Sequence, residues 1–253
     1  MKFSIIIPSF NQPDFIAETL ENVTSLKEEA AKRNIPVEII LFDACSGPEV
    51  QAIIDKYRPM LDLVRVEKDD GQYDAINKGI QASTGDYWTW LNTDDTLDKE
   101  GFFRLARLLE MDPLIDYVYG DIEHIDEKSK SIRYVPSYYF DLDLLVKQVP
   151  GIFQQGSFFR KSFTDKLGLL KPYRCSFDYE YVLRVLKNKG RVYWADFKVA
   201  NFRLHNASKT GSMTPVFIRE QLLISKDYGR KWFHFLSWFS HLRLIKHKIL
   251  PRK

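Results

Sequence analysis

The sequence predicts an α/β fold built on a doubly wound, mostly parallel sheet with helices on both faces. Through the first hundred residues, short apolar runs alternate with longer segments of helical period. These runs are apolar on both faces, as strands of a parallel sheet covered on both sides are. Polar residues gather where the runs end, and ligands of such sheets bind beyond the carboxyl ends of the strands.

The elements follow one another in a regular order. In the first half they are strand 3–8, helix 14–32, strand 37–43, a helix through 50–57, strand 61–67, helix 73–83 and strand 86–92. In the second half, strands are predicted at 115–126 and 131–139, and a helix opens at Asp178 and ends at Lys189 and Gly190. Strands joined by helices imply right-handed crossovers.

Composition bounds the class of protein. The chain has 253 residues, 45% of them hydrophobic, which is enough for one large domain with extensions. Its only cysteines, Cys45 and Cys175, have no metal-ligand spacing and suggest no disulfide framework, so we expect a cytoplasmic protein. The apolar stretch at the N-terminus stops at Pro8, too early for a signal peptide or a membrane span.

The loop after the first strand, PSFNQPDF, contains no glycine. A GxGxxG fingerprint is therefore missing there, and a GxxxxGK[ST] loop occurs nowhere in the chain. Both a dinucleotide-dependent dehydrogenase and a P-loop enzyme are disfavoured.

The acid pair Asp94 and Asp95 ends the last strand of the first half. Adjacent carboxylates repel each other, and a divalent cation that also binds a diphosphate would compensate that repulsion. The alternative is that one of these acids caps the helix that starts near Asp98.

The segments SIIIPSFNQPDFIAETLENV, EIILFD and DDGQYDAINKGIQASTGDYWTWLNTDD resemble, in order and spacing, the nucleotide-sugar-binding half of family 2 glycosyltransferases. The resemblance covers roughly the first 100 positions and implies the GT-A fold. It divides residues 1–229 into a nucleotide-sugar-binding half, 1–97, and an acceptor and catalytic half, 98–229. A basic tail, 230–253, follows.

The resemblance also implies roles for individual residues. Asp43 would contact the uracil, the acid Asp94 would face the ribose or nucleotide, and Asp95 would ligate Mn²⁺ or Mg²⁺. The implied positions around the nucleotide are Pro8, Ser9 and Asn11 against the base and ribose, with Asp74 and Lys78 at the pocket edge. Asp74 is alternatively a helix N-terminal acid and Lys78 a solvated lysine. The family often has D-x-x-S-x-D-x-T after strand two, whereas this chain has DACSGPEV.

The second half resembles the acceptor side of the same family. There QQGSFFRKS matches a Q-x-x-x-F-x-R-x-S pattern, which places Gln154, Gln155 and Ser157 near the sugar site unless they are turn residues. Asp178 matches the catalytic base, which would take the proton of the acceptor hydroxyl, and Glu180 is a competitor for this role.

The segment VANFRLHNASKTGS resembles a loop that closes over the diphosphate in many relatives. His205 is its candidate metal or phosphate ligand, with an ordinary loop histidine as the alternative. Arg203 or Lys209 could pair with phosphate.

These observations predict a metal-dependent, inverting glycosyltransferase with a nucleotide-sugar donor, UDP-linked, and a glycan or lipid-linked acceptor in bacterial surface polysaccharide assembly. No nucleic acid is predicted as a partner, and the oligomeric state is left open. Two rivals are a phosphoacceptor receiver domain, which would end near half this length, and a nucleotide-sugar-binding protein without activity.

The tail differs in charge from the body of the protein. Residues 230–253 hold seven Lys or Arg and no acid, so the preceding 229 residues carry 3 − 7 = −4. On a helix, aromatic and aliphatic residues of the tail share one face. We expect an interfacial helix that holds the enzyme on the inner face of the cytoplasmic membrane, or else a helix packed on protein.

Overall fold

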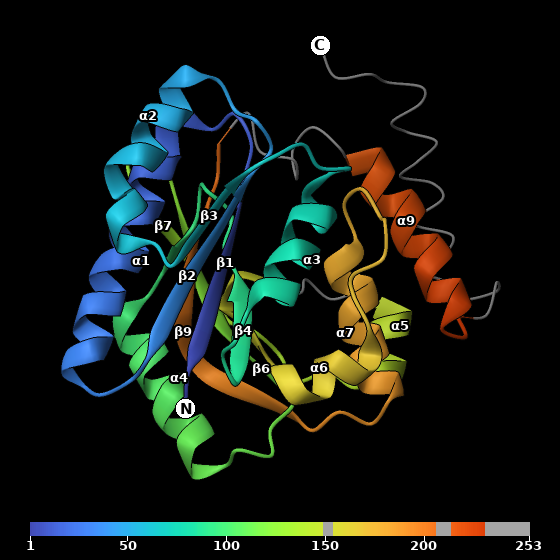
Figure 1. Cartoon of the computed structure of the whole chain (residues 1–253). Helices are drawn as coiled ribbons and strands as arrows, with labels where there is room; N and C mark the ends of the chain where they lie inside the picture. Colours follow the sequence, from blue (N-terminus) through green and yellow to red (C-terminus); the bar gives the residue numbers. More distant parts are fainter. Residues whose placement is uncertain (149–153, 206–213, 231–253) are drawn as a thin grey trace.

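The structure is a computed structural model of the whole chain, in which residues 1–148, 154–205 and 214–230 are described (Figure 1). The predicted membrane contact of the tail concerns residues that lie, apart from Arg230, outside these ranges, and it stays a prediction. None of the helices in the described ranges is long and apolar enough to cross a membrane.

The first half alternates strands and helices as predicted. Its elements are β1 (Phe3–Ser9), α1 (Pro13–Lys32), β2 (Val37–Asp43), α2 (Pro48–Tyr57), a 3₁₀ turn (Arg58–Met60), β3 (Leu63–Val66), α3 (Gln72–Ala82) and β4 (Tyr87–Trp90). Proline opens both α1 and α2, where its fixed φ suits the helix and its missing N–H costs nothing.

The second half is less regular. Its elements are β5 (Thr96–Leu97), α4 (Lys99–Met111), β6 (Tyr117–Ile125), β7 (Ser131–Val135), α5 (Leu142–Gln148), a 3₁₀ turn (Gln154–Gly156), β8 (Ser157–Arg160), α6 (Lys161–Leu167), α7 (Phe177–Lys187), β9 (Val192–Arg203) and α9 (Thr214–Asp227). The segment read as a loop from Val199 onward begins as the last five residues of β9. The helix predicted to open at Asp178 starts one residue earlier.

The strands form one sheet in the order β3-β2-β1-β4-β8-β6-β9-β5, with β7 paired to β6. The β3-β2-β1-β4 block is parallel, as expected, and β6 pairs in parallel with β9. Strands β5, β7 and β8 run antiparallel to their neighbours. The mostly parallel, doubly wound sheet predicted from the sequence is therefore confirmed, with antiparallel strands inserted in its second half.

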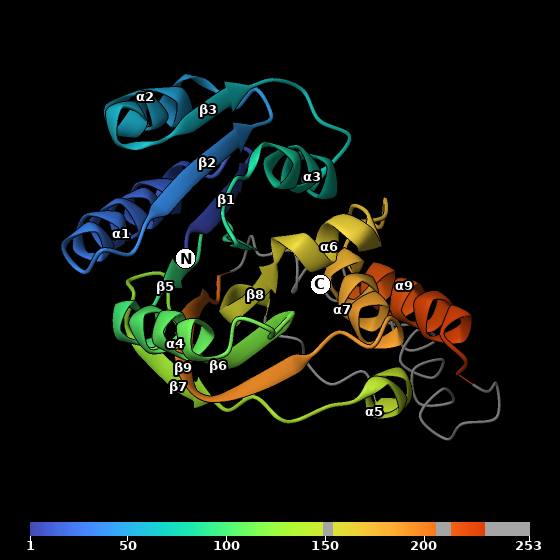
Figure 2. The ribbon, with the colours of Figure 1, turned by 60° about the horizontal axis from the view of Figure 1, so that its bottom comes forward.

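Helices cover both faces of the sheet (Figures 1 and 2). Side chains of β1 alternate between the faces: Ile5 and Ile7 pack with α1, α2 and α4, while Ile6 packs with α3, α5, α7 and α9. All three are fully buried. Strands β1, β2 and β4 are buried on both faces, which is why they read as nearly continuous apolar runs in the sequence.

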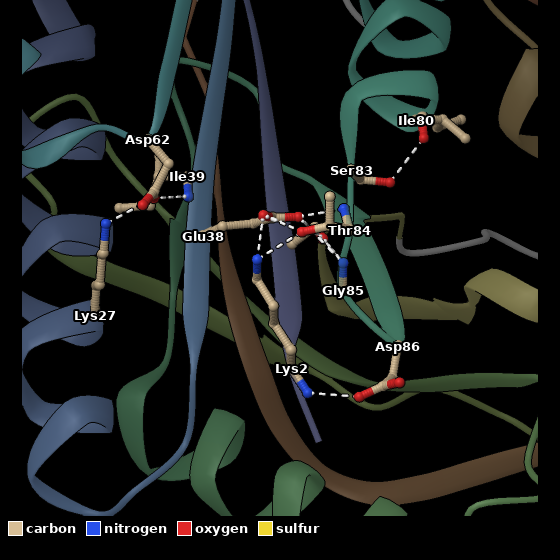
Figure 3. A network of polar contacts seen from close by, with 11 residues as sticks. Lys2, Lys27, Glu38, Ile39, Asp62, Ile80, Ser83, Thr84, Gly85 and Asp86 are labelled. Atoms are coloured by element: carbon tan, nitrogen blue, oxygen red, sulfur yellow. Dashed lines mark hydrogen bonds and ion pairs between the residues drawn. The ribbon is translucent and has the colours of Figure 1, made fainter.

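A buried carboxylate, that of Glu38, connects β1, β2 and the turn before β4 near the amino ends of the parallel strands (Figure 3). Glu38 of β2 accepts hydrogen bonds from Ser4 Oγ at 2.5 Å, Thr84 N at 2.6 Å and Thr84 Oγ1 at 2.7 Å, and pairs with Lys2 Nζ at 2.6 Å. Burial alone would raise the pKa of Glu38, but these donors together lower it to about 2. A Cβ on Gly85 would lie 2.5 Å from Ser4 Oγ, so glycine is needed beside this network.

Candidate active site

A cavity of about 430 Å³ opens at the carboxyl edge of the parallel block. Loops after four strands contribute to it, as expected for a doubly wound sheet. Its lining consists of Pro8 and Ser9 at the end of β1, Phe10 and Gln12 after it, Ala44 after β2, Lys68, Asp69 and Gly71 between β3 and α3, Gln72 at the start of α3, and Asn92, Thr93 and Asp94 after β4. Of the predicted nucleotide-binding residues, Pro8, Ser9 and Asp94 line this cavity.

Asp43 lies behind the cavity wall, where it is 1% exposed. Its carboxylate accepts hydrogen bonds from Ser9 Oγ (2.8 Å), Ser46 N (2.8 Å), Ser46 Oγ (2.6 Å) and Gln51 Nε2 (2.6 Å). Asn11, at a φ of 47°, joins the same loop, because its side-chain oxygen accepts from Gly47 N and its N–H donates to Ser46 Oγ. Asp43 thus fixes the shape of the wall through Ser9, and direct contact with a base stays a prediction.

The two adjacent acids occupy different environments. Asp94 lines the cavity, and its Oδ2 lies 2.9 Å from Nε2 of His205. Asp95 is fully buried, and its carboxylate accepts from Arg203 N at 3.0 Å, Gln155 Nε2 at 3.0 Å and Asn92 Nδ2 at 3.2 Å. Asp94, expected to face the nucleotide, is therefore the acid that lines the cavity, whereas Asp95, expected to ligate the cation, has no exposed surface, and its role as a ligand stays a prediction.

Asp95 has a raised pKa although three hydrogen-bond donors surround its carboxylate. Burial raises the pKa of Asp95 well above its ordinary value, and the charge of neighbouring Asp94 adds to this effect. Helix capping does not explain either acid, because Asp98 Oδ1 caps α4 by accepting from Gly101 N at 2.8 Å.

His205 follows β9 and contacts the acid loop, which is the segment 91–95 between β4 and β5, from 111 residues away in the sequence. Its side chain is 3% exposed and packs on Phe15 of α1, with ring centroids 4.7 Å apart. The structure thus brings His205 and Asp94 together. Whether His205 is a ligand or an ordinary loop histidine stays a prediction.

Arg203, expected as a possible phosphate partner, is 1% exposed and directed inward. Its guanidinium donates to Asp94 O at 2.9 Å, to Asp126 O at 2.8 Å and to Glu18 Oε2 at 2.7 Å. These bonds hold the acid loop to the end of β9 and to α1. The alternative candidate, Lys209, lies outside the described ranges.

The predicted acceptor-side residues are buried beneath the acid loop. Gln154 Nε2 donates to Trp90 O at 2.5 Å, Gln155 binds Asp95, and Ser157 Oγ lies 3.0 Å from the Tyr117 hydroxyl. Their side chains connect β4, β6 and the acid loop, so they support the site from below. Contact with a sugar stays a prediction.

Asp178 is the second residue of α7 and is partly buried. Burial raises the pKa of Asp178 to about 6, although the backbone N–H groups of Tyr179 and of Asp178 itself lower it. A carboxyl group with such a pKa is a poised general base near neutral pH. Asp178 is not among the residues that line the cavity, and its role as the base stays a prediction.

Glu180, the competing candidate, is fully buried in a structural network. It pairs with Lys171 Nζ at 2.8 Å and Arg184 Nη2 at 2.7 Å, and it accepts from the Tyr228 hydroxyl at 2.8 Å. Burial alone would raise the pKa of Glu180, but these partners outweigh burial and lower it. A carboxylate occupied in this way is a poor proton acceptor, which favours Asp178.

Two further predicted residues lie on α3, away from the cavity lining. Lys78 pairs with Glu67 at 2.9 Å and with Asp74 at 3.2 Å. These contacts fix the segment 67–74, whose residues Lys68 to Gln72 include four of the lining residues. Asp74 and Lys78 thus act on the pocket edge through the loop.

Known proteins are similar to this chain in sequence and in fold. The family model described as "Glycosyl transferase family 2" matches residues 4–168, more than half of the chain. The chain belongs to glycosyltransferase family 2. This excludes the receiver-domain alternative.

Several relatives of this family 2 glycosyltransferase are named. A "PGL/p-HBAD biosynthesis glycosyltransferase" of Mycobacterium bovis is 29% identical over 196 residues, which cover 75% of this chain and 72% of the relative. The "Poly(ribitol-phosphate) beta-N-acetylglucosaminyltransferase TarS" of Staphylococcus aureus is 28% identical over 146 residues, 55% of this chain and 23% of the relative.

Solved structures share the fold. TarS 1–349 of S. aureus in complex with UDP-GlcNAc superposes with a TM-score of 0.71 at 16% identity, covering 100% of this chain and 76% of that one. The mannosyltransferase PcManGT of Pyrobaculum calidifontis, in complex with GDP-Man and Mn²⁺, gives a TM-score of 0.63 at 13% identity and covers 97% and 69%.

The described side chains are too few to hold a divalent cation by themselves, so oxygens of a bound substrate would have to complete its coordination. Among residues 1–148, 154–205 and 214–230, no three His, Cys, Asp or Glu side chains lie grouped so that they could hold a metal. Asp94 and His205 offer two ligands at the cavity wall. Mg²⁺ in phosphate-transfer sites is held in a similar way, by one or two protein carboxylates and by oxygens of the substrate phosphates.

Sequence reasoning missed the lining contributed by residues 68–72. Gly71 has a φ of 122°, which side chains other than glycine rarely adopt, and Gln72 Nε2 donates to Asn92 Oδ1 at 2.7 Å. The glycine within DDGQ was the available signal, since it marks a turn just after a strand. Phe10, 60% exposed at the cavity, had no such signal.

Proposed function

We propose that this glycosyltransferase moves a sugar from a nucleoside diphosphate sugar, UDP-linked, to a hydroxyl group of a glycan or lipid-linked glycan, with inversion at the anomeric carbon. The observation that carries this proposal is the arrangement of acids: Asp94 with His205 at the cavity, and Asp178 with a pKa of about 6 outside it. The structures of TarS in complex with UDP-GlcNAc and with UDP support the choice of donor.

The donor would occupy the cavity of about 430 Å³. The loop after β1, supported by Asp43, would hold the base and ribose, and Asp94 would lie nearest the diphosphate. Lys68, an exposed cation of the lining, adds favourable charge for an anionic ligand. Asp94 and His205 would hold Mn²⁺ or Mg²⁺, which when bound supplies charge stabilisation for the departing diphosphate.

Asp178 would perform the proton transfer. The oxygen of the acceptor hydroxyl attacks the anomeric carbon, its proton passes to the Asp178 carboxylate, and the bond between that carbon and the diphosphate oxygen breaks. One attack from the face opposite the leaving group inverts the configuration. With a pKa of about 6, Asp178 is ionised at neutral pH and still accepts a proton as the hydroxyl reacts.

The relatives support a role in bacterial surface glycan or glycolipid assembly. One is named for a poly(ribitol-phosphate) acceptor and another for PGL/p-HBAD biosynthesis. We therefore propose an acceptor of the same general class, with transfer on the cytoplasmic side where nucleotide sugars are made.

Calorimetric titration with UDP tests the donor site. We expect UDP to bind with Mn²⁺ and to bind at least tenfold more weakly in EDTA, because phosphate oxygens and Asp94 would share the cation. Asp94→Asn should remove this difference. Asp95→Asn is the matched comparison, since it alters the same loop without altering the lining.

Two results would count against this assignment. Equal UDP binding with EDTA and with Mn²⁺ would contradict the cation site. Loss of the metal effect in Asp95→Asn but not in Asp94→Asn, with both variants folded, would return the ligand role to Asp95.

A further inference from the structure

Helix α9 reaches the start of the helix that bears the proposed base. Glu220 of α9 accepts hydrogen bonds from the backbone N–H groups of Arg174 at 2.7 Å, Cys175 at 2.9 Å and Ser176 at 2.9 Å. These three residues directly precede α7, and Asp178 is the second residue of that helix. Both ribbon views show α9 lying beside α7 (Figures 1 and 2).

The chain before α7 needs an acceptor from elsewhere. Ser176 stands at the N-cap position, but its side chain makes no capping bond, and its buried hydroxyl has no partner among the described residues. N–H groups at a helix start carry partial positive charge and require acceptors. Glu220 supplies one from 44 residues away, at a charge that suits the helix dipole.

A second contact fixes α9 along α7. The Tyr228 hydroxyl donates to Glu180, two residues after Asp178, at 2.8 Å, and Lys187 lies over the Tyr228 ring at 5.1 Å. Ile224, between the two anchors, is fully buried in the same core cluster as α7. Glu220 in the middle of α9 and Tyr228 just after its last residue thus attach the second half of α9 to α7.

We propose that Glu220 is a positioning residue for the reaction: it holds the start of α7 so that Asp178 faces the acceptor. This inference rests on the proposed role of Asp178 as base. It goes beyond that role, because it makes α9, which lies outside the matched family segment 4–168, a working part of the acceptor site.

The charges around Asp178 agree with this role. Two titratable side chains in the described structure face Asp178: Glu220 from α9 and Tyr117 from β6. Burial is the first cause that raises the pKa of Asp178, and the negative charge of Glu220 raises it further. Tyr117 carries no charge near neutral pH, since burial raises its own pKa far above the ordinary value.

The pH dependence of transfer, measured at saturating donor, tests the proposal. Glu220→Gln keeps an oxygen that can accept from the chain before α7 but removes the charge. We expect the lower apparent pKa of kcat/KM to fall by roughly half a unit to one unit. Glu220→Ala also removes the acceptor and should lower kcat about tenfold or more, because a small displacement of a base is costly. UDP affinity should stay within twofold in both.

Tyr228→Phe is the matched control on the same helix. It removes the other anchor of α9 without changing charge near Asp178, so thermal stability should fall while the pH profile stays in place. A pH profile that does not move in Glu220→Gln, together with a wild-type kcat in a folded Glu220→Ala protein, would overturn the proposal. So would an equal pKa shift in Tyr228→Phe.

The test separates this inference from the function on which it rests. If wild-type protein transfers sugar and Asp178→Asn does not, but the Glu220 variants behave as wild type, only the positioning role fails. If Asp178→Asn transfers sugar normally, the base assignment fails, and the positioning role fails with it.

Discussion

Two carboxylates in different parts of the molecule, Glu38 and Asp178, have pKa values that are shifted in opposite directions. At the amino edge, Glu38 has an ion pair and several hydrogen-bond donors, and its pKa falls to about 2. At the start of α7, the donors to Asp178 among the described residues are backbone N–H groups, and burial raises its pKa to about 6. Burial acts in the same direction on both acids, so the number and charge of the donors decide the outcome.

This difference distinguishes a structural acid from a reactive one. Glu38 joins β1, β2 and the turn before β4, and the ionised form is the one that holds them together. Within the described part of the chain Asp178 has no cation partner, and its protonated form is correspondingly easier to reach. The same difference occurs within α7. Glu180 lies two residues after Asp178, and its cation partners lower its pKa.

The largest expected effect is on catalysis. Asp178→Asn should lower kcat by about 10²- to 10⁴-fold with little change in UDP affinity, because a base acts mainly in the transition state. Steady-state transfer and calorimetry measure the two quantities. Asp165→Asn, on the exposed side of α6, is the control. If Asp178→Asn keeps more than a tenth of the wild-type kcat, Asp178 is not the base.

At the amino edge, the expected effect is on stability. Glu38→Gln should lower the free energy of unfolding by about 3 kcal/mol at pH 7, as estimated from the depressed pKa. A depressed folded pKa contributes stability above the unfolded value of about 4.3, and this is lost as pH falls toward 2. The difference from wild type should therefore shrink between pH 5 and pH 2 in urea titrations. Glu49→Gln, an exposed change, should show no such dependence.

A third prediction reverses that sign at Asp178. Its folded pKa lies above the unfolded value of about 3.9, so the folded state loses stability as pH rises from about 4 through 6. Asp178→Asn should consequently be more stable than wild type at pH 8, by about 3 kcal/mol, and nearly equal at pH 4. A variant that is less stable at pH 8 would show that ionised Asp178 is stabilised by the fold, contrary to the comparison.

The smallest effect concerns the wild-type enzyme. With the base protonated below its pKa of about 6, kcat/KM should be about tenfold lower at pH 5 than on its plateau above pH 7. Transfer assays at constant ionic strength give this profile. Full activity retained at pH 5 would show that the base has a low pKa, as Glu38 has, and would contradict the assignment of Asp178.

The first half of the fold was predictable because its signals are local. The run VEIILFD coincides with β2, and helical periodicity marked α1, α2 and α3 to within a few residues. Strand β5 has two residues and depends on pairing with β9, more than a hundred positions later. A strand this short carries no periodicity of its own.

The site was predictable in residue type and less so in geometry. The acid pair, His205 and Asp178 were all identified as candidates, but periodicity could not say which acid faces the cavity. That choice depends on the Arg203 N–H, which binds Asp95 from 108 residues away, and on His205, which meets Asp94 from 111. Both contacts come from the end of β9, where the sequence indicated a loop.

The pairing of β5 with β9 bears on modularity. Thr96 and Leu97 lie opposite Asn201 and Ala200, and Arg203 closes on the acid loop just beyond. A fragment ending at residue 97 would expose Leu97 and leave the buried Asp95 carboxylate without the Arg203 N–H. Donor specificity therefore cannot be exchanged between relatives by a cut at that boundary: a functional chimera must carry the end of β9 together with the half that it completes.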